Sequence, residues 1–191
     1  MRPGAVRSRL APWAAPAGTL LAAFLAAFPA RALDPDRALT QYVHESWGIE
    51  QGLPQVTARQ ILQSRDGYVW FGTQEGLVRF DGVRFTVFDT ARTPALGGNG
   101  INALAEDREG TIWIGRDDGL SRYRDGEITA VDLDDGLSRL PGEGVRRKDV
   151  VVILPGRNGD LWLAVHGGLL RYRDGRFEAL AVRDGLADET V

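Results

Sequence analysis

Short apolar runs alternate with turn residues along most of the chain. In the first repeat unit the runs cover 56–63, 68–73, 77–80 and 84–88, each with the length of a β-strand. Asp-Gly pairs stand at 66–67 and 81–82. A type I′ hairpin turn needs positive φ at both central residues, which Asn, Asp and Gly tolerate best. The pattern therefore predicts a four-stranded antiparallel meander folded by tight hairpins.

This unit is repeated. Three sets of landmarks keep the same two spacings of 43 and 49 residues: Trp70, Trp113 and Trp162; Gly67, Gly110 and Gly159; Gly76, Gly119 and Gly168. The six extra residues of the second interval fall in the turn-rich stretch 138–149. Further turn pairs stand at 125–126, 158–159 and 174–175, with the weaker Glu109-Gly110. The sequence thus contains three copies of one structural unit.

The second strand of each unit indicates how the units pack. Residues 69–71, 112–114 and 161–163 are apolar on both faces, so we expect each sheet to be covered on both sides. The small residue after each run (Gly72, Gly115, Ala164) would let a neighbouring backbone or indole come close. Four strands in 40 to 50 residues with stacked sheets favour an all-β fold of β-propeller blades. A β-sandwich and an open β-solenoid are the alternatives.

The segment "EDREGTIWIGRDDGLSRY" at 106–123 resembles the two-component regulator propeller repeat. The stretch "WGIEQGLPQVTARQILQSRDGYVWFGTQEGLVRFDGVRF" at 47–85 is similar to the first blade of such proteins, and the resemblance covers about residues 40–191. It implies the periplasmic sensor region of a hybrid histidine kinase or diguanylate cyclase. Members of this family generally carry two seven-bladed propellers, a small β-sandwich domain, a membrane helix and a cytoplasmic output domain.

We expect the chain to divide into a signal peptide (1–32), a lead-in with a candidate closing strand (33–55), blade 1 (56–88), blade 2 (101–133), blade 3 (150–182) and the start of a fourth blade (183–191). About three blades make an incomplete propeller, since ring closure takes roughly four to eight. The chain is therefore expected to be an N-terminal fragment of a longer sensor.

The N-terminus has the layout of an export signal. Arg2, Arg7 and Arg9 precede an uncharged run at 10–30, and Ala30-Arg31-Ala32 offers a cleavage site. An uncleaved membrane anchor is the alternative. Cleavage after residue 32 would remove four arginines and no acid, so the formal charge would change from −3 to −7, which disfavours nucleic acid as a partner. The chain has no cysteine, which excludes disulfides and thiolate metal sites. We expect a periplasmic chain whose full-length protein is anchored in the inner membrane.

Residues present in every unit are expected to be scaffold. We assign the three repeated tryptophans to the core, and Arg79, Arg122 and Arg171 to a structural ladder that bonds loop carbonyls or acids. Residues that differ between equivalent loops can form a ligand site: Gln74 and Glu75 in blade 1, Asp117 and Asp118 in blade 2, and Val165 and His166 in blade 3. Their acids suit sugar hydroxyls or a cationic group. Solvated turn residues are the alternative interpretation.

Other site chemistry has weak support in the sequence. His44 and His166 are the only histidines and do not have the spacing of metal ligands. Residues 132–136, "DLDDG", lack the rest of a calcium loop, so we expect an acidic hairpin there. Arg146-Arg147-Lys148 is expected to be a solvated loop, and no nucleophile elbow or phosphate loop is present. We therefore expect no cofactor, no metal and no catalytic residue.

Two functional hypotheses follow. The first is a sensor module that binds an extracellular small molecule or oligosaccharide, such as a glycan fragment. Its contact with a membrane would come only through a C-terminal part outside this chain or an uncleaved signal segment, and the full-length protein could be a homodimer. The second is a fragment of a periplasmic propeller lyase or hydrolase, with His166 as general base beside a blade-2 aspartate.

Overall fold

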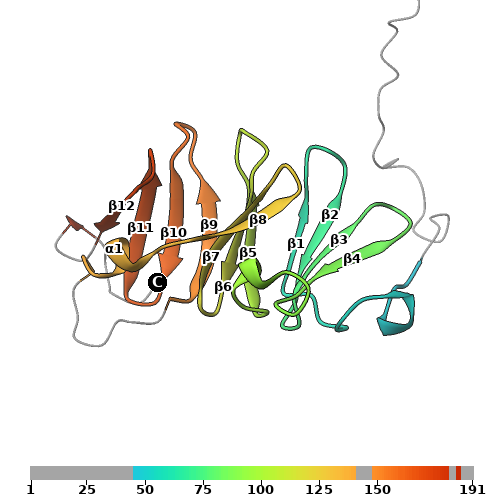
Figure 1. Ribbon diagram of the computed structural model, residues 1–191. Coiled ribbons are helices and arrows are strands. Elements are labelled where there is room, and N and C mark those ends of the chain that lie inside the picture. The colour runs from blue at the N-terminus through green and yellow to red at the C-terminus, as the bar shows by residue number, and fades with distance from the viewer. Residues whose placement is uncertain (1–44, 141–147, 181–183, 186–191) are drawn as a thin grey trace, which may run out of the picture. The chain divides into compact units, whose positions relative to one another are not determined.

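The computed structural model describes residues 45–140, 148–180 and 184–185. These residues form three antiparallel sheets of four strands, each a meander in sequence order (Figure 1). Blade 1 contains β1 (Gln60–Gln63), β2 (Val69–Gly72), β3 (Leu77–Phe80) and β4 (Phe85–Phe88). Blade 2 contains β5 (Ile101–Glu106), β6 (Ile112–Arg116), β7 (Gly119–Arg124) and β8 (Glu127–Val131). Blade 3 contains β9 (Val150–Pro155), β10 (Leu161–Val165), β11 (Gly168–Arg173) and β12 (Arg176–Leu180).

The helical segments of the described residues are short: η3 (Ile49–Gln51), η4 (Pro94–Leu96) and α1 (Asp134–Leu137). The first strands of consecutive blades contact each other, as expected for propeller blades arranged around an axis. The predicted fold class, all-β with about three blades of an incomplete propeller, is confirmed. Within the described residues, no helix is long and apolar enough to cross a membrane.

Two apolar cores fill the spaces between consecutive sheets. Trp70, Leu77 and Leu96 pack with Ile112 and Ile114 between blades 1 and 2. Between blades 2 and 3, Trp113 and Leu120 pack against residues of β9, β10 and β12. All five residues of β6 are buried, because blade 2 has a sheet on each face.

Blades 1 and 3 do not meet the expectation that every sheet is covered on both faces. Val69 and Phe71 are only half-buried, and so is Trp162. Among the described residues, blade 1 and blade 3 each have one neighbouring sheet, so the apolar run of their second strands is fully covered on one side only.

Small residues after the apolar runs do allow close approach. A Cβ at Gly72 would lie 2.8 Å from Ile101 Cγ2, and a Cβ at Gly115 would lie 2.9 Å from the Val150 carbonyl oxygen. Both glycines therefore admit the first strand of the next blade, as the sequence predicted.

The hairpin turns are of two kinds, where the sequence predicted one. Positive φ at both central residues, as type I′ requires, occurs at Asp125-Gly126 and Asp174-Gly175. At 66–67, 81–82 and 158–159 only the glycine has positive φ. The strands around these pairs are separated by four or more residues, so a longer turn joins them and the residue before glycine keeps an ordinary conformation.

Three further expectations are corrected or fall outside the described residues. The first strand begins at Gln60 rather than at residue 56. The stretch 132–136 enters helix α1 instead of forming a hairpin, and Gly136 there packs against Phe177, where a Cβ would lie 2.8 Å from the Phe177 Cβ. The expected signal peptide, His44, residues 146–147 and 186–191 lie outside the described part of the chain.

Candidate ligand-binding face

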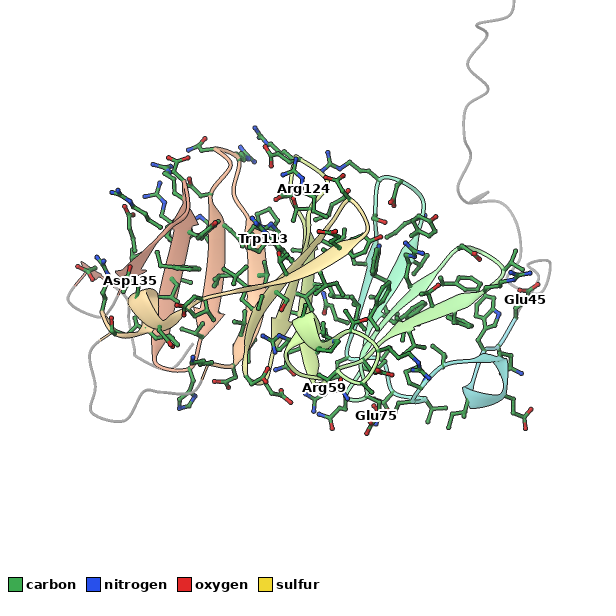
Figure 2. All side chains as sticks on the ribbon, in the orientation of Figure 1. Glu45, Arg59, Glu75, Trp113, Arg124 and Asp135 are labelled. Carbon is green, nitrogen blue, oxygen red and sulfur yellow. The ribbon has the colours of Figure 1, made fainter. Side chains whose placement is uncertain are left out.

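The predicted site residues lie in equivalent loops between second and third strands. Gln74 and Glu75 join β2 to β3, Asp117 and Asp118 join β6 to β7, and His166 lies between β10 and β11. Figure 2 shows Glu75 and Arg59 at one edge of the sheets and Arg124 at the opposite edge. We call the edge that carries these loops the loop face.

A hydrogen-bonded network crosses from blade 1 to blade 2 on the loop face. Arg59 Nη1 donates to Asn102 Oδ1 at 2.6 Å, and Asn102 Nδ2 donates to Asp117 Oδ1 at 2.7 Å. Arg59 Nη1 also lies 3.9 Å from Asp117 Oδ1. With the Gln74 amide oriented to satisfy its neighbours, its oxygen accepts from Arg59 Nη1 at 3.0 Å. The structure therefore brings Gln74 and Asp117 together through Arg59 and Asn102.

Sequence reasoning missed Arg59 and Asn102. The two positions are 43 residues apart, so they are equivalent in the repeat, and blade 3 has Val151 there. Variation between these equivalent positions is the sequence signal that identifies them, as it does for the loop residues. Arg59 and Asp117 keep side-chain exposures of 42% and 57%, so their remaining polar atoms face solvent.

Asp118 has a structural role. It accepts a hydrogen bond from Nη1 of Arg116, whose side chain is only 5% exposed. Burial lowers the pKa of the Arg116 guanidinium, and the Asp118 carboxylate opposes that shift. A Cβ at Gly98 would lie 2.5 Å from Asp118 Oδ1, so the glycine-rich loop 97–100 closes over this pair.

Glu75 and His166 are exposed and stand apart from the network. The Glu75 backbone N–H donates to Thr73 Oγ1 at 3.1 Å, which fixes the loop but leaves the carboxylate outside. Among the described residues, no hydrogen bond or ion pair joins His166 to Asp117 or Asp118.

The blade-3 loop is shifted by one residue from the predicted register. Val165 is the last residue of β10 and pairs with Gly168, as Arg116 pairs with Gly119 in blade 2. The loop residues equivalent to Asp117-Asp118 are therefore His166-Gly167, and Val165 is fully buried.

The repeated residues are scaffold, with partners that vary. The indole N–H of Trp70 donates to Ser64 Oγ at 3.0 Å, and that of Trp113 donates to Asp107 Oδ2 at 2.7 Å. Of the predicted arginine ladder, Arg171 binds an acid as expected, with Nη2 2.7 Å from Asp160 Oδ2. Arg79 instead donates to the Tyr123 hydroxyl at 3.0 Å, and Arg122 donates to the Thr129 hydroxyl at 3.1 Å.

No group of three or more His, Cys, Asp or Glu side chains suited to a metal ion occurs in the described ranges. The chemistry that the loop face offers is hydrogen bonding: a guanidinium, two amides and a carboxylate lie within one connected cluster.

Comparison with known proteins agrees with the repeat analysis. The family model described as two component regulator propeller matches residues 52–75 and 95–115. No curated protein matches the sequence.

Similar solved structures include two extracellular domains from B. thetaiotaomicron. The one assigned to the hybrid two component system BT3049 is 25% identical, with a TM-score of 0.64 over 76% of this chain and 21% of that chain. The one assigned to BT4673 is 24% identical, with a TM-score of 0.52 over 65% of this chain and 17% of that chain. The chain thus spans about a fifth of the length of these neighbours.

Virginiamycin B lyase from Staphylococcus aureus shares the fold alone, at 18% identity and a TM-score of 0.51 over 68% of this chain and 43% of that chain. The family match, the three sheets and the extracellular-domain neighbour point to the same repeat. The chain has the fold of an incomplete β-propeller, and its residues 52–75 and 95–115 match the two-component regulator propeller repeat.

Proposed function

We propose that the chain is part of the periplasmic ligand-sensing propeller of a membrane-bound signal-transduction protein, either a hybrid histidine kinase or a diguanylate cyclase. The family match and the extracellular-domain neighbours of two-component systems support this proposal. The export-signal pattern at residues 1–32 supports a location outside the cytoplasm.

The polar network of Gln74, Arg59, Asn102 and Asp117 carries the assignment of a binding site. Its members come from two blades, differ from the equivalent residues of blade 3, and lie at an exposed edge. A scaffold residue would be repeated in every blade, as the tryptophans are. A cluster specific to one pair of blades fits recognition better.

The proposed ligand is an oligosaccharide fragment. Donors from Arg59 and Asn102 stand beside acceptors from Asp117 and Gln74, and sugar hydroxyls both donate and accept hydrogen bonds. Binding would transmit a signal only if the ligand favours one arrangement of the sensor over another, because equal affinity for both states shifts no equilibrium.

Binding can be tested by titrating the full chain with a panel of neutral oligosaccharides and recording the melting temperature. At least one sugar should raise it in a concentration-dependent way. Arg59→Gln should weaken binding of that sugar about tenfold, since a charge-assisted hydrogen bond is lost. Arg124→Gln, at the opposite edge, is the matched control and should bind normally. Equal loss in both variants would contradict the proposed site.

An enzymatic function is the alternative, since a lyase shares the fold and His166 is exposed on a loop of the same kind. It predicts that a sugar is consumed rather than bound, with a product visible by mass spectrometry. His166→Gln would then abolish turnover. If a sugar raises the melting temperature without any product, and His166→Gln shows the same rise, the sensor function would be supported.

A further inference from the structure

A groove lies between the outer strands of blades 2 and 3, away from the loop-face network. It has a volume of about 400 Å³ and is lined by residues of β7, β8, α1, β11 and β12, including Arg122, Val131, Asp132, Tyr172 and Arg176. This volume is within the range of small-molecule sites. The repeat offers an internal comparison, because the same space exists between blades 1 and 2.

Between blades 1 and 2 that space is filled by an aromatic ring. The Phe88 ring lies 6.1 Å from the Trp70 ring and 6.0 Å from the Tyr123 ring. The Arg79 guanidinium stacks 4.5 Å above the Tyr68 ring and donates to the Tyr123 hydroxyl. Packing and a hydrogen bond together close this interface.

The equivalent residues leave the space open between blades 2 and 3. Val131 stands where blade 1 has Phe88, and Thr111 stands where it has Tyr68, each 43 residues further on. Arg122 is the equivalent of Arg79, but position 111 offers it no aromatic ring to stack on. It donates to the Thr129 hydroxyl instead of to Tyr172, the equivalent of Tyr123. Val131 lines the groove, so the replacement of the Phe88 ring by a small side chain contributes to the open space.

The groove carries charges of both signs, because Asp132 and Asp135 line it together with Arg122 and Arg176. Among the described residues, no acid pairs with the guanidinium of Arg122 or of Arg176, and both side chains are exposed. Of the two acids, Asp135 is paired with Arg139 at 2.9 Å. Asp132 accepts a hydrogen bond from the Asp134 backbone N–H at 2.9 Å, which leaves its negative charge in place. An anion in the groove would therefore meet two guanidiniums that have no acidic partner among the described residues, against the single carboxylate of Asp132.

The apolar part of the groove suits a ring. Tyr172 packs 4.8 Å from Phe177 and 5.4 Å from Trp113, so its ring is held in place. A fixed aromatic side chain beside two guanidiniums offers a stacking surface next to an anion site. We propose that this groove binds a small molecule that carries a carboxylate on a six-membered ring. The proposal does not depend on the loop-face site.

In the test, each of four probes is titrated into the full chain, and binding is measured by NMR or calorimetry. The carboxylates are glucuronate and 4-hydroxybenzoate, and their neutral counterparts are glucose and 4-hydroxybenzyl alcohol. At least one carboxylate should bind, about tenfold tighter than its neutral counterpart. The pair that binds distinguishes a sugar ring from an aromatic ring.

Three variants of groove residues locate the site, and two variants elsewhere serve as controls. Arg122→Gln and Arg176→Gln should each lower the affinity about tenfold, whereas Arg124→Gln should not change it. Val131→Phe restores the ring that blade 1 has at this place, so it should abolish binding while the far-ultraviolet dichroism and the cooperative melting transition are retained. Arg59→Gln, on the loop face, should leave carboxylate binding unchanged.

Several results would overturn the proposal. They are failure of both carboxylates to saturate below roughly 10 mM, equal affinity for the neutral counterparts, and unchanged binding in a folded Val131→Phe variant. Loss of oligosaccharide binding in Arg59→Gln with carboxylate binding intact would separate this groove from the loop-face site.

Discussion

Asp160 shows how a single carboxylate can replace the usual partners of the repeat. It is 5% exposed and accepts hydrogen bonds from Arg171 and Arg173, with Arg173 Nη2 at 2.7 Å. Blade 2 has Thr111 at this position and blade 1 has Tyr68. Because the acid is unique to blade 3, the arginine ladder has an ionic partner there and aromatic or hydroxyl partners elsewhere.

This ion pair makes a prediction about pH. The hydrogen bond from Arg173 is the largest cause that lowers the pKa of Asp160, and Arg171 adds to it. The folded pKa is below the unfolded one of about 3.9, so the stability it contributes is present above pH 4 and is lost as pH falls through the folded value. Asp160→Asn should therefore have a lower melting temperature than the unmodified chain at pH 7. The difference between the two melting temperatures should be smaller at pH 3.

Asp174→Asn is the control, because its exposed turn position with φ +49 also suits asparagine. At pH 7 its melting temperature should stay close to that of the unmodified chain. If the difference in melting temperature between Asp160→Asn and the unmodified chain stayed constant from pH 7 to pH 3, the stabilising role of the Asp160 charge would be contradicted.

The second strands show how one sequence pattern gives different burial in different blades. Trp113 on β6 is 5% exposed and belongs to the core between blades 2 and 3. Trp162 on β10 is half-buried, and Leu154 beside it on β9 is 61% exposed. The next sheet, and not the strand itself, buries the indole.

We predict that Trp113→Ala destabilises the described fold by about 3–5 kcal/mol, the range for a buried tryptophan. Trp162→Ala should cost at least about 1 kcal/mol less, because less apolar area is lost from its contacts. Urea unfolding monitored by far-ultraviolet dichroism measures both. Equal costs would mean that the outer face of blade 3 is covered in solution.

Among the three blades, we expect blade 2 to be the most stable against local unfolding. Each sheet contacts only its neighbours, and blade 2 has two of them among the described residues. β6 is buried along its whole length, while β2 and β10 are not.

Amide hydrogen exchange followed by mass spectrometry can test this order. Peptides that cover 112–116 should exchange more slowly than those that cover 69–72 or 161–165, because opening blade 2 breaks two interfaces. Slower exchange in blade 3 than in blade 2 would contradict nearest-neighbour packing.

Much of the fold was predictable from sequence. The spacing of Trp70 and Trp113 and their apolar neighbours predicted stacked four-stranded sheets, because a strand that is apolar on both faces needs two partners. The candidate site was only partly predictable. Gln74 and Asp117 were found by their variation between repeats, whereas Arg59 entered the network through a contact made between blades.

The sequence by itself determined the repeat, the strand pattern and the small residues that admit the next blade, since these depend on local periodicity and on side-chain size. The tertiary structure alone decided which variable residues meet. It joined Asp117 of blade 2 to Arg59 before blade 1, and it opened a groove beside Val131 between blades 2 and 3. Such contacts form between blades, where distance in space is set by packing and not by separation along the chain.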